Sequence, residues 1–114
     1  MASNWRKARI KPLDIALDRD NPRINVEPSD KESDIIRKLI KYEDVVDLAR
    51  KIAKTGLLPG ERIITAQENG QWVVLEGNRR ICACKLLLSP NLVPVEYRKT
   101  FPTILTSIHP PSGT

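Results

Sequence analysis

The residues best suited to chemistry are Gly77-Asn78-Arg79-Arg80, which lie where a β-rich run passes directly into a helix-forming run. Arginines in the first turn of a helix face the positive end of its dipole, which is unfavourable unless an anion is bound there. The amides of that turn point outward, and a guanidinium can contact phosphate through two nitrogens. The segment therefore predicts an anion site, and it equally suits a tight turn whose arginines are solvated or paired with Glu76.

Acidic side chains near this turn suggest a second kind of chemistry. Cleavage of a phosphodiester requires carboxylates that hold a metal ion, or a general base with a nucleophile. Glu76, beside the turn, is a weak catalytic candidate, and Asp18 and Asp20 are further carboxylates. The commoner role of such residues is as surface or ion-pairing carboxylates.

The thiols do not indicate a site. Cys82 and Cys84 are two residues apart in a helix-forming stretch, where their side chains diverge and cannot easily form a disulfide. The single histidine, His109, is far along the chain, so metal-ligand spacing is lacking and we expect no structural metal. Buried packing is the better interpretation of both cysteines.

Length and composition limit the architecture that positions these groups. The chain has 114 residues, a formal net charge of +5 and 40% hydrophobic residues, which suits one domain with one core. No stretch approaches the roughly 20 uncharged apolar residues of a membrane span, and the basic N-terminus lacks the apolar core of a signal peptide. We therefore expect a soluble, cytoplasmic protein with no membrane partner.

Proline and glycine place the domain boundaries. We expect a flexible N-terminus at 1–9, one domain at 10–99, and a Pro-rich tail or linker stump at 100–114. Such a stump would make the chain a module of a longer protein.

The first half of the domain predicts one strand and two helices. Arg9–Leu17 alternates apolar and polar residues as a strand does, although Pro12 limits it to a sheet edge or a late start. Asp18–Arg23 is turn chemistry. Two amphipathic helices follow, the first capped by Pro28-Ser29-Asp30, Ser33 or Asp34, and the second ended by Gly56. Their apolar stripes are Ile35, Ile36, Leu39 and Ile40, and Val45, Leu48, Ala49 and Ile52.

The second half predicts a hairpin, a helix and a strand. Arg62–Gln67 and Trp72–Leu75 are β-rich runs joined through Asn69-Gly70, a strong hairpin signal. Arg79–Leu88 is helix-forming, and Val93–Tyr97 alternates as a short final strand. The predicted class is α/β of the α+β kind, a small mixed sheet with a β-hairpin packed against about three helices.

The array of motifs resembles the N-terminal domain of the ParB family, within the ParB/sulfiredoxin superfamily. The resemblance runs from about Ile10 to Tyr97: I-x-P-L-x-I, N-P-R, two helices ending in K-T-G-L-L, a hairpin, and L-E-G-N-R-R-I-C-A-C-K-L-L before P-V-E-Y. It implies that the turn before the third helix binds nucleotide phosphates, of CTP in ParB proteins and of ATP in sulfiredoxins, with Mg²⁺. The implied nucleotide-binding residues are Gly77, Asn78, Arg79 and above all Arg80, with Gly56 and Arg23 in two neighbouring turns.

Departures from the family pattern limit what carries over. Asn78 occupies the position of the sulfiredoxin catalytic cysteine, so a sulfiredoxin-type reductase is not expected. Leu58 stands where ParB proteins often have glutamine, which puts base or ribose contacts from that loop in doubt. Asn21-Pro22-Arg23 also suits a merely rigid turn. The chain lacks a helix-turn-helix, so site-specific DNA clamping is beyond these residues.

Three functions remain open. The first is a nucleotide-phosphate-binding, DNA-associated ParB-like module of a bacterial or plasmid protein, with a triphosphate and DNA as partners and a second copy or a neighbouring domain beside it. The second is a metal-dependent nuclease or NTP hydrolase that uses Glu76. The third is a protein-interaction domain whose nucleotide pocket has decayed. The sequence leaves open which nucleotide binds and whether hydrolysis occurs.

Overall fold

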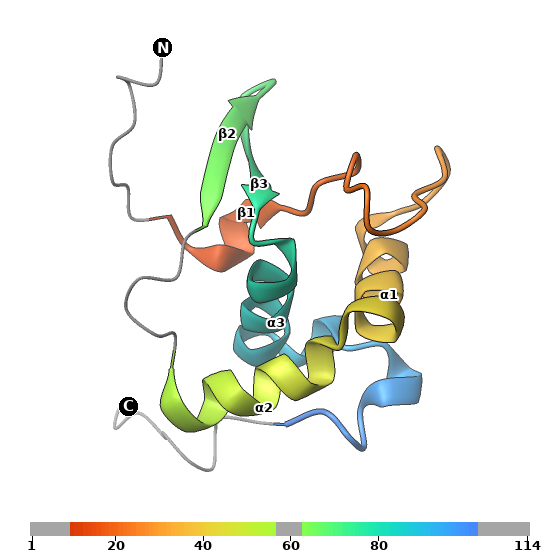
Figure 1. Cartoon of the computed structure of the whole chain (residues 1–114), viewed down its shortest axis with the longest axis vertical. Coiled ribbons are helices and arrows are strands. Elements are labelled where there is room, and N and C mark those ends of the chain that lie inside the picture. Colours follow the sequence, from red (N-terminus) through yellow and green to blue (C-terminus); the bar gives the residue numbers. More distant parts are fainter. Residues whose placement is uncertain (1–9, 57–62, 103–114) are drawn as a thin grey trace.

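The computed structural model describes residues 10–56 and 63–102, in which three α-helices pack against a three-stranded sheet (Figure 1). The strands are β1 (Ile15–Ala16), β2 (Ile64–Glu68) and β3 (Gln71–Glu76), and the helices are α1 (Glu32–Glu43), α2 (Val45–Thr55) and α3 (Asn78–Leu88). The predicted α+β class, a small mixed sheet against three helices, is confirmed. No helix in these two ranges has the length and apolar character that a bilayer crossing requires.

β3 is the central strand of the sheet. β1 pairs with it in parallel, with Ile15 opposite Trp72, and β2 pairs with it antiparallel, with Ala66 opposite Val73. Asn69 and Gly70 join β2 to β3 with φ angles of 54° and 79°, the double positive φ of a type I′ turn. The predicted hairpin at Asn69-Gly70 is confirmed.

α3 lies at the centre of the molecule and contacts β3, α1 and α2 (Figure 1). It is buried along almost its whole length because it is covered on several sides. Cys82 and Cys84 are free and buried in it, as expected of packing residues. Burial raises the pKa of the Cys82 thiol to about 12. The core consists largely of aliphatic residues of these elements: Ile15, Leu17, Ile35, Ile36, Leu39, Val45, Ala49, Val74, Ile81 and Leu86.

The first predicted strand is much shorter than its sequence pattern suggests. Residues Pro12–Asp14 form a 3-10 turn, in which the Asp14 amide donates to the Lys11 carbonyl at 2.8 Å, and β1 begins only at Ile15. Pro12 favours this turn because its ring fixes φ and it has no N–H for a ladder. The late start and the edge position both follow from this proline.

The sequence predicts the end of α2 better than the start of α1. α1 begins at Glu32, with Lys31 as its N-cap, so Ser29, Asp30 and Ser33 do not cap it. Asp34 takes part from the third helical position, where its carboxylate accepts the Lys31 amide at 2.8 Å. Gly56 ends α2 as predicted, with φ at 75° and its amide bonded to the Ile52 carbonyl at 2.7 Å.

The prediction of a final strand at Val93–Tyr97 is wrong. Two 3-10 turns, Pro90–Leu92 and Val95–Tyr97, follow α3 instead. Pro94 cannot donate to a ladder, and the two valines do not share a face, because Val93 is 2% exposed and Val95 is 69% exposed. Phe101, near the end of the described residues, also packs against the core.

Candidate phosphate-binding site

Gly77 links β3 to α3 in a left-handed conformation, with φ at 104° and ψ at 22°. A Cβ at this position would lie 3.0 Å from Cγ1 of Ile63, closer than carbon atoms normally approach. The space freed by the missing side chain is therefore filled by Ile63 and does not open toward a ligand. The backbone turn and this close contact together explain the glycine.

Asn78 is 9% exposed and attaches the loop that follows β1, beginning at Asp18, to the start of α3. Its Oδ1 accepts a hydrogen bond from the Asp18 amide at 2.8 Å. The loop then turns locally, because Asp18 Oδ1 accepts the Asp20 amide and Asn21 Oδ1 accepts the Arg23 amide, each at 2.9 Å. The N-P-R turn and the G-N-R-R turn, about 60 residues apart in the sequence, thus meet at one place.

Arg79 points toward the junction of α1 and α2. Its Nε donates to the Glu43 carbonyl, and its Nη2 donates to the Asp44 carbonyl at 3.4 Å. A cation is favourable there because the last carbonyls of α1 carry partial negative charge. The carboxylate of Glu43 pairs with Arg23 at 3.2 Å, so both arginines meet at the end of α1.

The first turn of α3 retains the features of an anion site. Its first helical hydrogen bond runs from the Ile81 amide to the Gly77 carbonyl at 2.9 Å, so the amides of residues 78–80 lack partners within the helix. Gly77 has no side chain to cap them, and the turn contains no acidic residue. Arg80 is partly buried in this turn. The first turn of this central helix thus contains two arginines and no acidic residue.

Two other predicted residues do not join this arrangement: Gly56 is distant, and Glu76, next to Gly77 in the chain, is exposed. Gly56 is at the far end of α2 from Asp44, about 18 Å away by the rise of a helix. The rest of its turn, with Leu58, is outside the described residues. Glu76 is the exposed last residue of β3. Within residues 10–56 and 63–102, no three His, Cys, Asp or Glu side chains gather where they could hold a metal ion.

Sequence reasoning missed the buried Lys85 of α3. Its Nζ donates to the Ile15 carbonyl and lies 3.4 Å from Oε1 of Glu32. The available signal was a lysine inside the otherwise apolar run Ile81–Leu88. Its partners are 70 and 53 residues away, so the sequence does not reveal them.

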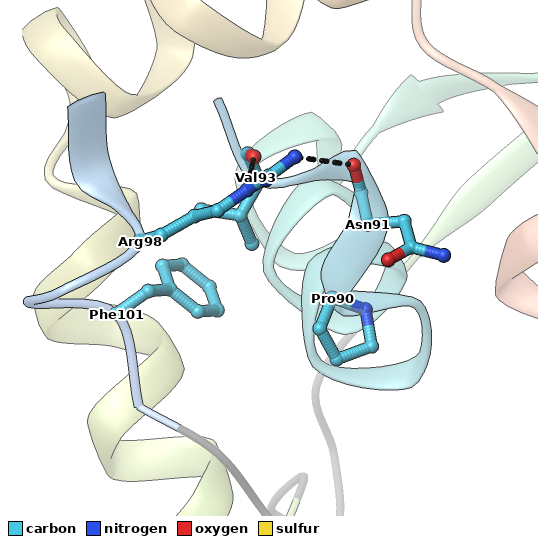
Figure 2. Close-up of a pocket in the computed structure, with 5 residues that line it drawn as sticks. All are labelled: Pro90, Asn91, Val93, Arg98 and Phe101. Atoms are coloured by element: carbon cyan, nitrogen blue, oxygen red, sulfur yellow. Dashed lines mark hydrogen bonds between the residues drawn. The ribbon is translucent and has the colours of Figure 1, made fainter. Parts of the chain in front are cut away.

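A small pocket of about 230 Å³ lies beyond the opposite end of α3 (Figure 2). Pro90, Val93 and Phe101 line it together with Asn91 and Arg98. The Arg98 side chain turns back toward the preceding segment of the chain. It donates to the Val93 carbonyl at 2.9 Å and to the Asn91 carbonyl at 3.3 Å. Its guanidinium therefore stabilises the two 3-10 turns of this segment.

The start of α3 is the place where the chemically promising residues gather, with the Asp18–Arg23 loop on one side and the end of α1 on another. No protein-family model, curated protein or solved structure matches the chain.

Proposed function

We propose that the chain binds the phosphate groups of a nucleoside triphosphate, CTP or ATP, at the start of α3. The observation that carries this proposal is a first helical turn that follows Gly77, contains Arg79 and Arg80, and has neither an acidic residue nor a capping side chain. Such a turn stabilises negative oxygen atoms through hydrogen bonds and the helix dipole. In this proposal, Arg80 supplies the positive charge that attracts the anion.

The order of elements supports the nucleotide as ligand. Strand, loop, two helices, hairpin and helix follow one another in the order of the motifs that resemble ParB N-terminal domains, although the final strand is replaced by 3-10 turns. The Asp18–Arg23 loop is bonded to the G-N-R-R turn through Asp18 and Asn78. Mg²⁺ would arrive on the phosphate oxygens of the nucleotide, because the described carboxylates do not form a metal site of their own.

Nucleic-acid phosphate is a less favoured ligand of the same turn. Arginines that could follow a DNA backbone instead donate to the chain's own carbonyls. Arg19 binds the carbonyl of Asp30, and Arg50 binds that of Thr100. A phosphate-tracking groove needs several cations on one face. A role beside DNA in a longer bacterial or plasmid protein therefore belongs to the proposal only as context for a nucleotide-binding module.

One set of observations favours a second candidate, a protein-interaction domain with a decayed pocket. Gly77, Asn78 and Arg79 each have an internal role, in the contact with Ile63, the bond to Asp18 and the bonds to α1. A turn built for internal contacts alone would have the same three residues. Nucleotide binding itself distinguishes the two candidates. For a nuclease or hydrolase, Glu76 offers only an exposed carboxylate at the end of β3.

Calorimetric titration with CTP, ATP and GTP, each with and without Mg²⁺, tests the proposal. We expect one triphosphate to bind and Arg80→Ala to weaken it about tenfold or more, since hydrogen bonds to charged groups contribute about 1.5–3 kcal/mol. Arg37→Ala is the matched control, because Arg37 is exposed on α1 and pairs with Glu96. Absence of binding by all three triphosphates would favour the protein-interaction candidate.

A further inference from the structure

β1 is held in place by two charged side chains as well as by its neighbouring strand. Only Ile15 and Ala16 pair with β3, and β1 is at the edge of the sheet. Lys85 Nζ donates to the Ile15 carbonyl, and Glu32 Oε2 accepts the Leu17 amide at 3.2 Å. The two side chains are themselves joined, with 3.4 Å between Lys85 Nζ and Glu32 Oε1.

This arrangement replaces a neighbouring strand. The carbonyl of one strand residue and the amide two residues later point to the same side, where the next strand would offer one donor and one acceptor. On the side of β1 away from β3, the ammonium of Lys85 supplies that donor and the carboxylate of Glu32 supplies the acceptor. The ion pair thus completes the hydrogen bonding of an edge that would otherwise be unsatisfied.

The placement of Lys85 is costly unless it has such a role. The residue is 3% exposed, and a charge in a core is unfavourable without a partner and hydrogen bonds. A methionine would fill a similar volume without that cost. Glu32 is more accessible, with 39% of its side chain exposed, so it can be changed without leaving a cavity in the core.

Glu32 and Leu17 are also the two ends of one loop. Leu17 precedes Asp18, whose amide is bonded to Asn78 at the start of α3. Arg19 then ties the loop together by donating to the carbonyls of Glu27, Pro28 and Asp30 at 2.7–3.2 Å. Two residues after Asp30 the chain reaches Glu32, which binds back to Leu17. The loop is therefore closed on itself, and the Lys85–Glu32 pair fastens the closure to α3.

We propose that Glu32 and Lys85 are positioning residues that hold β1 and the Asp18–Asp30 loop against the start of α3. Loss of the pair releases β1 and the loop while the three helices stay folded. The consequence for ligand affinity rests on the proposed function, because the loop borders the turn that would bind phosphate. The release of the loop itself does not depend on any ligand.

Hydrogen exchange of the full chain, read by mass spectrometry, tests this proposal. In Glu32→Ala we expect amides of residues 15–20 to exchange about tenfold faster, the effect of losing roughly one net hydrogen bond with its charge partner. Amides in the middle of α1 and α3 should keep their rates. Glu32→Gln retains an acceptor for the Leu17 amide and should show an intermediate rate. Lys51→Met, which breaks the exposed Lys51–Asp47 pair of α2, should leave residues 15–20 unchanged.

Three results would overturn the proposal: unchanged exchange at residues 15–20 in Glu32→Ala, equal acceleration throughout the chain, or equal rates in the Ala and Gln variants. Lys85→Met provides an independent second variant and should accelerate the same segment. Titration of Glu32→Ala with Mg²⁺–CTP and Mg²⁺–ATP then separates the two ideas. Faster exchange with no triphosphate binding even by the unsubstituted chain would reject the proposed function and leave the positioning role standing.

Discussion

Single residues at the start of α3 have internal structural roles, and a sequence motif does not distinguish these roles from anion binding. Gly77 is required by a positive φ and by the approach of Ile63, and Arg79 neutralises the carbonyls at the end of α1. These are contacts between segments that are far apart in the sequence. In the proposed function, charge recognition depends most on Arg80, which belongs to the first turn of α3.

Substitution of Gly77 separates backbone strain from packing. Gly77→Ala should lower the free energy of unfolding by about 2–3 kcal/mol, of which about 1–2 come from the left-handed backbone and about 1 from the contact with Ile63. Gly70→Ala is the matched control, because φ is 79° there and no atom lies within 4 Å of an added Cβ. Urea denaturation measures both. Equal losses in the two variants would mean that the contact with Ile63 contributes nothing.

At the scale of elements, two ion pairs attach irregular segments of the chain to α1. Arg37 of α1 donates to Glu96 of the Val95–Tyr97 turn at 2.7 Å, and this hydrogen bond holds the pKa of the Glu96 carboxyl below its ordinary value of 4.5. Lys38 similarly lowers the pKa of Asp30 in the loop before α1. The pairs attach the turn after α3 and the loop before α1 to the same helix.

The Arg37–Glu96 pair predicts a specific acid response. A carboxyl whose pKa is lowered in the folded state stabilises that state above its ordinary pKa of 4.5 and loses the effect as the pH falls through the lowered value. In Glu96→Gln, the free energy of unfolding should therefore fall less steeply as the pH is lowered below about 4.5. Arg37→Gln should produce the same flattening, because it removes the partner. Urea denaturation between neutral and acid pH measures this slope, and an unchanged slope in both variants would contradict the assignment.

The sequence predicted those elements whose signals are local. Asn69 and Gly70 specify their turn because both adopt positive φ angles. Gly56 likewise ends α2 through a positive φ angle of its own. The alternation of Val93, Val95 and Tyr97 misled because Pro94 interrupts it and nothing covers Val95, which is exposed. Lys85 and Arg79 could not be interpreted from sequence, since their partners are set by the packing of α3 against β1 and α1.

For the whole molecule, several of the cations behind the net charge of +5 are held in place by the chain's own backbone. Arg19, Arg50, Arg79, Lys85 and Arg98 all donate to backbone carbonyls of the chain. These five cations thus stabilise loops and helix ends. We therefore expect the proposed site to bind one compact anion in preference to a long phosphate backbone.

Salt dependence tests this view of the whole surface. If double-stranded DNA binds through Arg80 and the start of α3, about two phosphates are involved, and the logarithm of the association constant should fall with the logarithm of salt with a slope of about −2. Fluorescence anisotropy of a labelled duplex measures it. A slope of about −6 or steeper would reveal a phosphate-tracking surface and contradict the preference for a nucleotide.

The central claim, that phosphate groups bind at the start of α3, is tested most directly by amide chemical shifts. Mg²⁺–CTP and Mg²⁺–ATP would be titrated into the ¹⁵N-labelled chain, with inorganic triphosphate as a probe for the phosphates alone. We predict that the largest saturable shifts occur at the amides of Asn78, Arg79 and Arg80, and that Arg80→Ala moves their midpoint to a ligand concentration about tenfold or more higher. Shifts confined to other segments, or no shifts at these three amides with any of the ligands, would contradict the claim.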